Sequence, residues 1–394
     1  MDNPIDEFLS LRGGHLRYNK MQLSTVNRIL GATMDYKRFY RVLVGIVILV
    51  LGATAIINYF VDPAMIFYRG RYIAAAGKWL GEGKAIAMPT NTDERLLQKS
   101  FIEQRGAADV LVLGSSRAMA CSSEVFPGQT LHNGSVSGAQ INDLLAVFEL
   151  YVENHGLPGT VLVEVEPWTF SKNWQDKRFK SISEYYRRGV ERVQAAVVIN
   201  DNEIANYDNE LISFPYLASS LKMLSEGRLP TDDGFMITTP TEDIEYHKVL
   251  PDGSHQWRRS ERERTAAEVD SLAKADIANK FLYGMNDYKE IDPVQLEKFT
   301  AFMQYLMDNN IKVYVWETPL YPATYDALAI LVPYSMVAAA DKKLKELADT
   351  YNYKLIGSYN PRVVGVSEQD FMDAIHLQMP AQVRIMKQAV AAAK

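Results

Sequence analysis

An unbroken apolar run is the feature that most limits what this chain can fold into. Residues 42–60 read VLVGIVILVLGATAIINYF and contain no charged side chain. About 20 apolar residues in a helix match the hydrocarbon thickness of a bilayer. The sequence therefore predicts a transmembrane helix over residues 41–61. A buried core helix and a cleaved signal peptide are the alternatives, and the polar leader before the run disfavours the second.

The charges before this run predict its orientation. Lys37, Arg38 and Arg41 stand on its N-terminal side, and basic residues favour the cytoplasmic side of a membrane. We therefore expect residues 1–40 to form a cytoplasmic tail, either an interfacial amphipathic helix or a loosely ordered segment. The rest of the chain is then extracytoplasmic, in the periplasm or outside the cell, on a single-pass anchor in the cell membrane.

The composition argues against several classes of function. The chain of 394 residues has a net charge of −6 and no run of Lys or Arg, so no nucleic-acid partner is expected. Its one cysteine, Cys121, permits neither an intrachain disulfide nor a cysteine-based zinc site. No histidine lies in a metal-binding pattern, and no P-loop or GxGxxG is present. We expect no metal and no other cofactor.

Short apolar runs alternate with helical patterns in the remainder of the chain. Apolar residues recur at helical spacing in residues 142–154 and 296–307. Strands that alternate with helices predict an α/β fold, a doubly wound parallel sheet of the flavodoxin-like kind, over residues 106–394. The expected strands are residues 110–113, 130–132, 161–165, 313–316 and 354–356.

One long segment does not follow this alternation. Residues from about 171 to 287 are rich in Tyr, Arg and acidic residues and contain polar turn clusters. We interpret them as a large insertion that packs over the carboxyl edge of the sheet, as a lid or a partner surface. Residues 62–105 are expected to connect the membrane helix to the domain.

Two motifs far apart in the chain predict one catalytic site. Gly114-Ser115-Ser116 follows the first strand, and Asp373 precedes His376 by three residues near the C-terminus. A serine, a histidine and an aspartate are the parts of an acyl-transfer site, in which the histidine takes the hydroxyl proton and the aspartate orients the imidazole. The alternatives are a plain turn, Ser115 as the nucleophile, and a helix-capping role for His376.

These motifs, in this order, resemble the SGNH superfamily of GDSL-like esterases and acetyltransferases. The resemblance implies that Ser116 is the nucleophile, that Asp373 and His376 complete the triad, and that no cofactor is needed. It also implies an oxyanion hole formed by the backbone N–H groups of Ser116 and Gly138, because residues 132–138 match the second block of the family.

The third block departs from the family, which normally supplies an Asn there. This chain has Glu164-Val165-Glu166-Pro167-Trp168. The oxyanion hole therefore has two backbone donors or borrows another group, such as Asn173. Arg117 is either a surface residue or a partner for an anionic substrate group. The ring of Trp168 either stacks on a sugar or packs under a loop.

The Gly-Ser-Ser turn, the missing Asn and the anchor together resemble the membrane-anchored branch of the family, the DltD-like and alginate-type O-acetylation proteins. This resemblance implies a serine O-acyltransferase or esterase that acts on an extracytoplasmic polysaccharide, with acetyl as the most common acyl group. It also implies a partner, either a multispanning MBOAT-type acyltransferase or a polysaccharide synthase complex. The alternative is a catalytically silent, membrane-anchored scaffold of such a complex.

Overall fold

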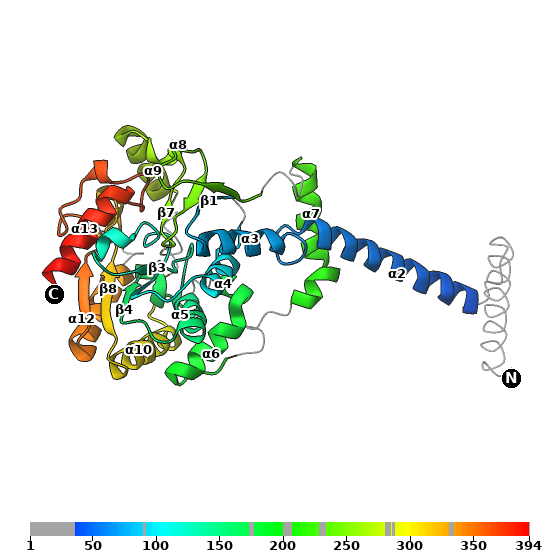
Figure 1. Ribbon diagram of the computed structural model, residues 1–394, viewed down its shortest axis with the longest axis horizontal. Helices are drawn as coiled ribbons and strands as arrows, with labels where there is room; N and C mark the ends of the chain where they lie inside the picture. The colour runs from blue at the N-terminus through cyan, green and yellow to red at the C-terminus, as the bar shows by residue number, and fades with distance from the viewer. Residues whose placement is uncertain are drawn as a thin grey trace, which may run out of the picture.

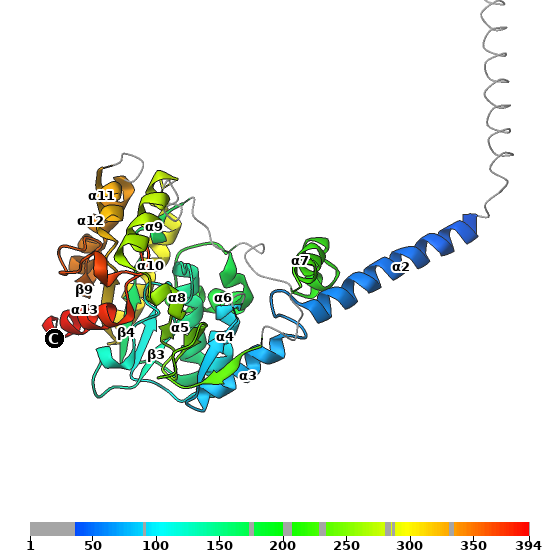
Figure 2. The same ribbon diagram turned by 90° about the horizontal axis from the view of Figure 1, so that it is seen from above.

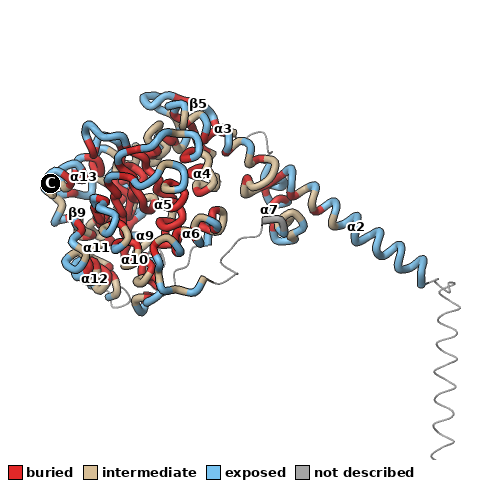
Figure 3. The backbone as a smooth tube through the Cα atoms, turned by 60° about the horizontal axis from the view of Figure 1, so that its bottom comes forward, coloured by how far each residue is buried: buried red, intermediate tan, exposed pale blue. Residues whose placement is uncertain are grey.

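A long helix projects from an α/β domain in the computed structural model (Figure 1). Helix α2 (Tyr36–Val61) is 26 residues long, and most of its surface is exposed, as Figure 3 shows. In the described part of the chain it is the one unbroken helix that is long and apolar enough to cross a bilayer. The expected helix of spanning length is therefore confirmed. The structure describes residues 36–89, 92–172, 177–199, 207–227, 234–279, 285, 288–330 and 335–393.

A sheet of five parallel strands forms the centre of the domain. Their order is β3-β2-β4-β8-β9, which is 2-1-3-4-5 when the five are numbered along the chain. This is the order of a doubly wound, flavodoxin-like sheet. The predicted α/β fold is confirmed, with all five strands close to their expected positions. The strands are β2 (Val110–Leu113), β3 (Leu131–Asn133), β4 (Thr160–Glu164), β8 (Lys312–Glu317) and β9 (Lys354–Gly357).

Helices cover both faces of this sheet, which explains why β2 is apolar along its whole length and why β4 and β8 are apolar except at their ends. Right-handed crossovers place α5 (Ile141–His155), α10 (Pro293–Asp308) and α12 (Ser335–Tyr351) on one face, where α10 contacts the other two. Helix α13 (Met379–Ala392) packs with β9 and with the 3-10 turn η1 (Ser123–Val125). All four residues of β2 are buried between these layers.

A second sheet joins segments that are far apart in the chain. Its four antiparallel strands have the order β5-β1-β6-β7. They are β1 (Ala85–Met88), β5 (Met236–Thr238), β6 (His247–Val249) and β7 (His255–Gln256). The expected connector thus contributes a strand, together with α3 (Gly70–Gly81) and α4 (Glu94–Gln104). No pattern in the sequence predicts a strand in any of these places.

The expected insertion is distributed over three parts of the molecule. Helix α6 (Ser183–Val193) packs on α5 beside the 3-10 turn η3 (Arg178–Ile182). Turn η5 (Tyr207–Ile212) and α7 (Phe214–Ser225) pack against α2. Strands β6 and β7, with α8 (Arg259–Arg262) and α9 (Ala266–Ala278), follow.

Part of the insertion reaches the carboxyl ends of the parallel strands. The backbone N–H of Asn133 donates to the carbonyl of Asp252 at 2.8 Å, and that of His255 donates to the carbonyl of Met119, also at 2.8 Å.

Three further short elements lie outside the two sheets and the insertion. They are η2 (Pro167–Phe170), α11 (Pro322–Ile330) and η8 (Glu368–Asp370).

Candidate active site

Ser116 lies in a tight turn directly after β2. A Cβ atom on Gly114 would come within 2.6 Å of the Cβ of Glu164 and 2.8 Å of that of Ala118, so glycine is the residue that fits there. This close approach holds the Gly114–Ser116 turn against the end of β4. The Ser116 side chain stays half-exposed, and its Oγ lies 2.9 Å from the Nε2 of His376.

His376 is held by Asp373 in the loop between η8 and α13. The imidazole Nδ1 lies 2.8 Å from Asp373 Oδ2, which fits a donating Nδ1–H and leaves Nε2 free to accept the Ser116 proton. The N–H groups of Ile375 and His376 donate to Asp373 Oδ1 at 2.9 and 2.7 Å. The structure thus brings together the three residues that the motifs predict.

The environment of Asp373 keeps its carboxylate ionised. Burial acts to raise its pKa, but the charge and the hydrogen bond of His376, with the two backbone N–H donors, outweigh burial and lower the pKa to about 2. An ionised Asp373 can stabilise an imidazolium at His376 when Ser116 loses its proton.

Two backbone N–H groups at this site, those of Ser116 and Gly138, have no hydrogen-bond acceptor among the described residues. Gly138 has a φ of +60°, in the left-handed region that favours glycine. Its loop is held against the Ser116 turn because the N–H of Val136 donates to the carbonyl of Gly114 at 3.0 Å. Free amides at this place fit the expected oxyanion donors.

Arg117 differs from both sequence interpretations, because it lies neither at the surface nor where a substrate could reach it. It is 1% exposed and forms an ion pair with Glu166. Its Nε donates to the carbonyl of Ile375 at 3.1 Å, and its NH2 group donates to the carbonyls of Thr318 and Pro319 at 2.6 and 2.9 Å. The guanidinium therefore joins the Ser116 turn, two strand ends and the His376 loop.

Ser115 is fully used by the two glutamates that replace the third family block. Its N–H donates to Glu164 Oε2 at 2.8 Å, and its hydroxyl donates to Glu166 Oε1 at 2.6 Å. Burial, and then the charge of Glu166, raise the pKa of Glu164 well above its usual range. Burial thus favours the neutral form of the Glu164 carboxyl. The Ser115 N–H and hydroxyl are both taken up by the two glutamates, so Ser115 is not placed as a nucleophile.

The two remaining substrate-binding candidates gain no support. Trp168 is 3% exposed and belongs to the main hydrophobic core, so its ring presents no accessible face to a sugar. Asn173 lies outside the described residues.

An aromatic residue that the sequence analysis missed lies beside the triad. The Trp257 ring centroid is 4.9 Å from that of His376, and the His247 ring stacks on the indole with a centroid distance of 4.7 Å. His255 Nδ1 in turn lies 3.2 Å from His247 Nε2. Trp257 follows β7, so the insertion supplies one wall of the site. Its sole sequence signal is a Trp in a polar, turn-rich segment.

His247 and His255, which follow Trp257 in this chain of contacts, are neutral near pH 7. Burial lowers the pKa of His247 to about 3 and that of His255 to about 4. Within the described residues, no group of three or more His, Cys, Asp and Glu side chains is arranged to hold a metal ion.

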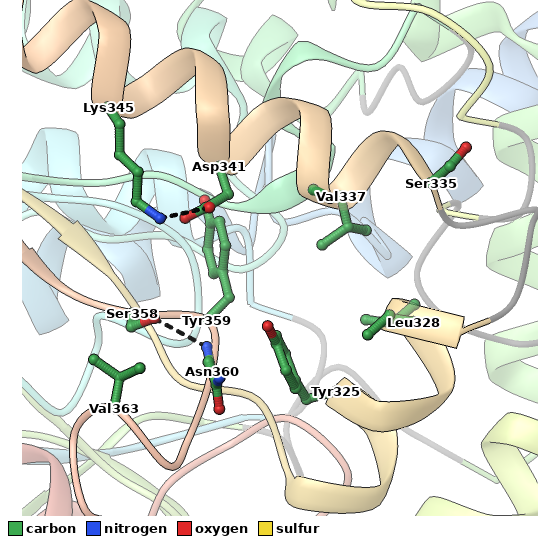
Figure 4. Close-up of a pocket in the computed structure, with 12 residues that line it drawn as sticks. Tyr325, Leu328, Ser335, Val337, Asp341, Lys345, Ser358, Tyr359, Asn360 and Val363 are labelled. Carbon is green, nitrogen blue, oxygen red and sulfur yellow. Dashed lines mark hydrogen bonds and ion pairs between the residues drawn. The ribbon is translucent and has the colours of Figure 1, made fainter.

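A separate cavity of about 210 Å³ lies between α11, α12 and the loop after β9 (Figure 4). Tyr325 and Leu328 line it opposite Asp341 and Lys345, which form an ion pair. None of the triad residues lines this cavity, so we do not connect it to the site around Ser116.

Comparisons with known proteins add little to this geometry. No protein-family model and no curated protein matches the chain. The crystal structure of a proposed acylhydrolase from Bacteroides fragilis is similar with 12% identity and a TM-score of 0.28, over 72% of this chain and 85% of that one. A TM-score this low supports no conclusion about shared fold or function.

Proposed function

We propose that this protein is a membrane-anchored serine enzyme that moves an acyl group through an acyl-serine at Ser116. The observation that carries the proposal is the chain of two hydrogen bonds, 2.9 Å from Ser116 Oγ to His376 Nε2 and 2.8 Å from His376 Nδ1 to Asp373 Oδ2. This order of atoms is the one that nucleophilic acyl transfer requires.

In the first step, Ser116 Oγ attacks the carbonyl carbon of an acyl donor while its proton passes to His376 Nε2. The ionised Asp373 stabilises the resulting imidazolium, and the free N–H groups of Ser116 and Gly138 are the donors for the oxyanion. The C–O bond to the leaving group then breaks, and the leaving oxygen takes the proton from His376. The product is an ester between the acyl group and Ser116.

In the second step, His376 takes the proton of an acceptor hydroxyl, which attacks the acyl-serine. The bond to Ser116 Oγ breaks, and Ser116 regains the proton from His376. Water as acceptor makes the protein an esterase, whereas a sugar hydroxyl makes it an O-acyltransferase.

The anchor suggests where this chemistry takes place. Helix α2 has the length and the apolar surface of a membrane span, and Lys37, Arg38 and Arg41 precede its apolar part. We infer an extracytoplasmic active site that acylates or deacylates a polysaccharide, with acetyl as the main acyl group. A multispanning MBOAT-type acyltransferase or a polysaccharide synthase complex is the proposed partner that brings the donor or the polymer to the site.

A fluorophosphonate probe tests the enzymatic proposal directly. It should label the full-length protein, and Ser116→Ala should abolish the labelling. Ser115→Ala is the matched control, because it removes the neighbouring hydroxyl but leaves the nucleophile. Labelling that survives in Ser116→Ala and disappears in Ser115→Ala would show that Ser115, and not Ser116, is the nucleophile.

A catalytically silent scaffold is the second candidate. It is favoured by the third block, where Glu164 and Glu166 occupy the place of the usual Asn and bind the Ser115 turn instead of a substrate. If a strain that carries Ser116→Ala acylates its polymer normally while a deletion strain does not, the scaffold is correct and the enzyme is not.

A further inference from the structure

Helix α7 has an apolar face that no described part of the chain covers. Phe214, Leu221 and Leu224 are 57%, 49% and 38% exposed. With Ala218 and the half-buried Leu217, they recur at three- and four-residue spacings and so share one side of the helix.

The other sides of α7 have different surroundings. Tyr216, Ser220 and Met223 are buried against the rest of the molecule, whereas Ser219 and Lys222 form an exposed polar side. The helix is therefore amphipathic, but its apolar stripe is not the side that packs on the protein.

Polar contacts fix α7 to the C-terminal end of α2. The Nδ2 of Asn58 donates to the carbonyls of Glu210, Leu211 and Ser213, each at 3.1 Å. The Tyr216 hydroxyl donates to Asp62 Oδ1 at 2.7 Å. Because Asn58 lies in the last turn of α2 and is 0% exposed, α7 is held at the depth where the apolar helix ends.

The direction of α7 differs from that of α2. In Figure 1, α7 extends across the line of α2, and in Figure 2 the same helix is seen nearly end-on while α2 still lies in the plane of the view. A helix that runs across a membrane span at its end lies along the membrane surface.

Aromatic side chains mark the same depth. Tyr59 and Phe60 are 42% and 51% exposed in the last turn of α2, and the Tyr68 ring lies 6.1 and 5.3 Å from theirs. The guanidinium of Arg71 lies 3.7 Å from the Tyr68 ring centroid. Amphipathic aromatic rings and cationic side chains are typical of the boundary between lipid headgroups and acyl chains.

We propose that α7 is an interfacial membrane helix, with Phe214, Leu217, Ala218, Leu221 and Leu224 inserted among the lipids of the outer leaflet. This inference rests on the proposed membrane insertion of α2. Lipid is the occupant because α7 packs on α2, at whose C-terminal end the exposed aromatic side chains and Arg71 lie. Two attachments, α2 and α7, then fix the height and tilt of the domain above the membrane.

Depth-dependent quenching tests this arrangement in the full-length protein reconstituted into vesicles that contain lipids with a shallow nitroxide. Leu221→Cys and Lys222→Cys, each labelled with NBD, are a matched pair on adjacent positions of α7. The native Cys121 is buried and should not react, which unsubstituted protein verifies. We expect quenching at Leu221→Cys to exceed that at Lys222→Cys several-fold, and Leu224→Cys to repeat the result.

Equal, weak quenching at positions 221, 222 and 224 would overturn the proposal. Leu49→Cys, at an exposed position within α2, separates the two causes of failure. If a deep nitroxide quenches the label at position 49 but lipids do not quench position 221, the interfacial helix alone is wrong. If position 49 is also unquenched, the anchor itself is wrong. If position 221 becomes shielded solely when a multispanning partner is added, its apolar face binds protein instead of lipid.

Discussion

Within the candidate active site, each member of the triad has one neighbour that fixes it. Ser116 stays half-exposed in a turn that Gly114 lets approach β4, and His376 is oriented by Asp373, which two backbone N–H groups hold in place. None of the three belongs to the hydrophobic core clusters, so substitutions should separate activity from stability if the roles of these residues are chemical.

The first prediction concerns the triad. Ser116→Ala and His376→Ala should each lower acyl transfer by about 10³-fold or more, since the three residues act as one unit. Asp373→Asn should be about as severe because it favours the wrong imidazole tautomer. Steady-state rates and thermal unfolding of each variant check this, and unfolding temperatures should stay near that of the parent. If Asp373→Asn kept most activity while His376→Ala did not, His376 would have another orienting partner.

The second prediction concerns the buried ion pair behind the Ser116 turn. Glu166→Ala leaves the Arg117 guanidinium buried and unpaired, and should destabilise the fold by about 3–5 kcal/mol. Glu164→Gln should change stability by less than about 1 kcal/mol, because burial favours the neutral form of the Glu164 carboxyl and an amide resembles that form in shape and charge. Denaturant unfolding of the two variants measures the difference, and equal losses would mean that Glu164 is ionised in the fold.

At the scale of elements, sequence patterns predict the parallel sheet well and the antiparallel sheet not at all. Strands β2, β4 and β8 are buried, mostly apolar runs that stand out from their surroundings, whereas β3 and β9 are recognised chiefly by their place in the alternation of strands and helices. Strands β1, β5, β6 and β7 have two to four residues each, and β1 pairs with segments of the distant insertion. No local periodicity is visible over such lengths, so pairing of this kind is established by tertiary packing.

The third prediction concerns how the two buried histidines of β6 and β7, His247 and His255, make stability depend on pH. The pKa values of His247 and His255 are lowered from 6.5 to about 3 and about 4, so the unfolded chain binds protons that the folded chain does not. The two neutral histidines make their full contribution to the free energy of unfolding above about pH 6.5, and this contribution falls as the pH drops toward 4. His247→Gln should reduce the slope of unfolding free energy against pH by up to about 1.4 kcal/mol per unit in that window. An unchanged slope would mean that His247 is already protonated in the fold.

For the whole molecule, the sequence predicts the triad and the helix of spanning length, because both depend on short local patterns. It does not predict the burial of Arg117, whose partners come from three other segments, or the position of Trp257 beside His376. Both features depend on the tertiary contacts between the insertion, the strand ends and the His376 loop. The three candidate catalytic residues are thus easier to find from the sequence than the residues that surround them.

The fourth prediction concerns topology. If Lys37, Arg38 and Arg41 hold the N-terminal side in the cytoplasm, a reporter fused after Lys394 should be active exclusively outside it. Protease added to spheroplasts should digest the domain and spare the tail. Protection of the domain would place the active site inside the cell and exclude an extracytoplasmic polymer as its substrate.

The central claim is that Ser116 carries the acyl group during turnover. The most direct measurement is to mix the full-length protein with p-nitrophenyl acetate, quench with acid, and locate the added acetyl group by peptide mass spectrometry. The account predicts an acetyl group on Ser116 that accumulates within a turnover and is absent in His376→Ala. An active protein with unmodified Ser116, or with its acetyl group on another residue, would contradict it.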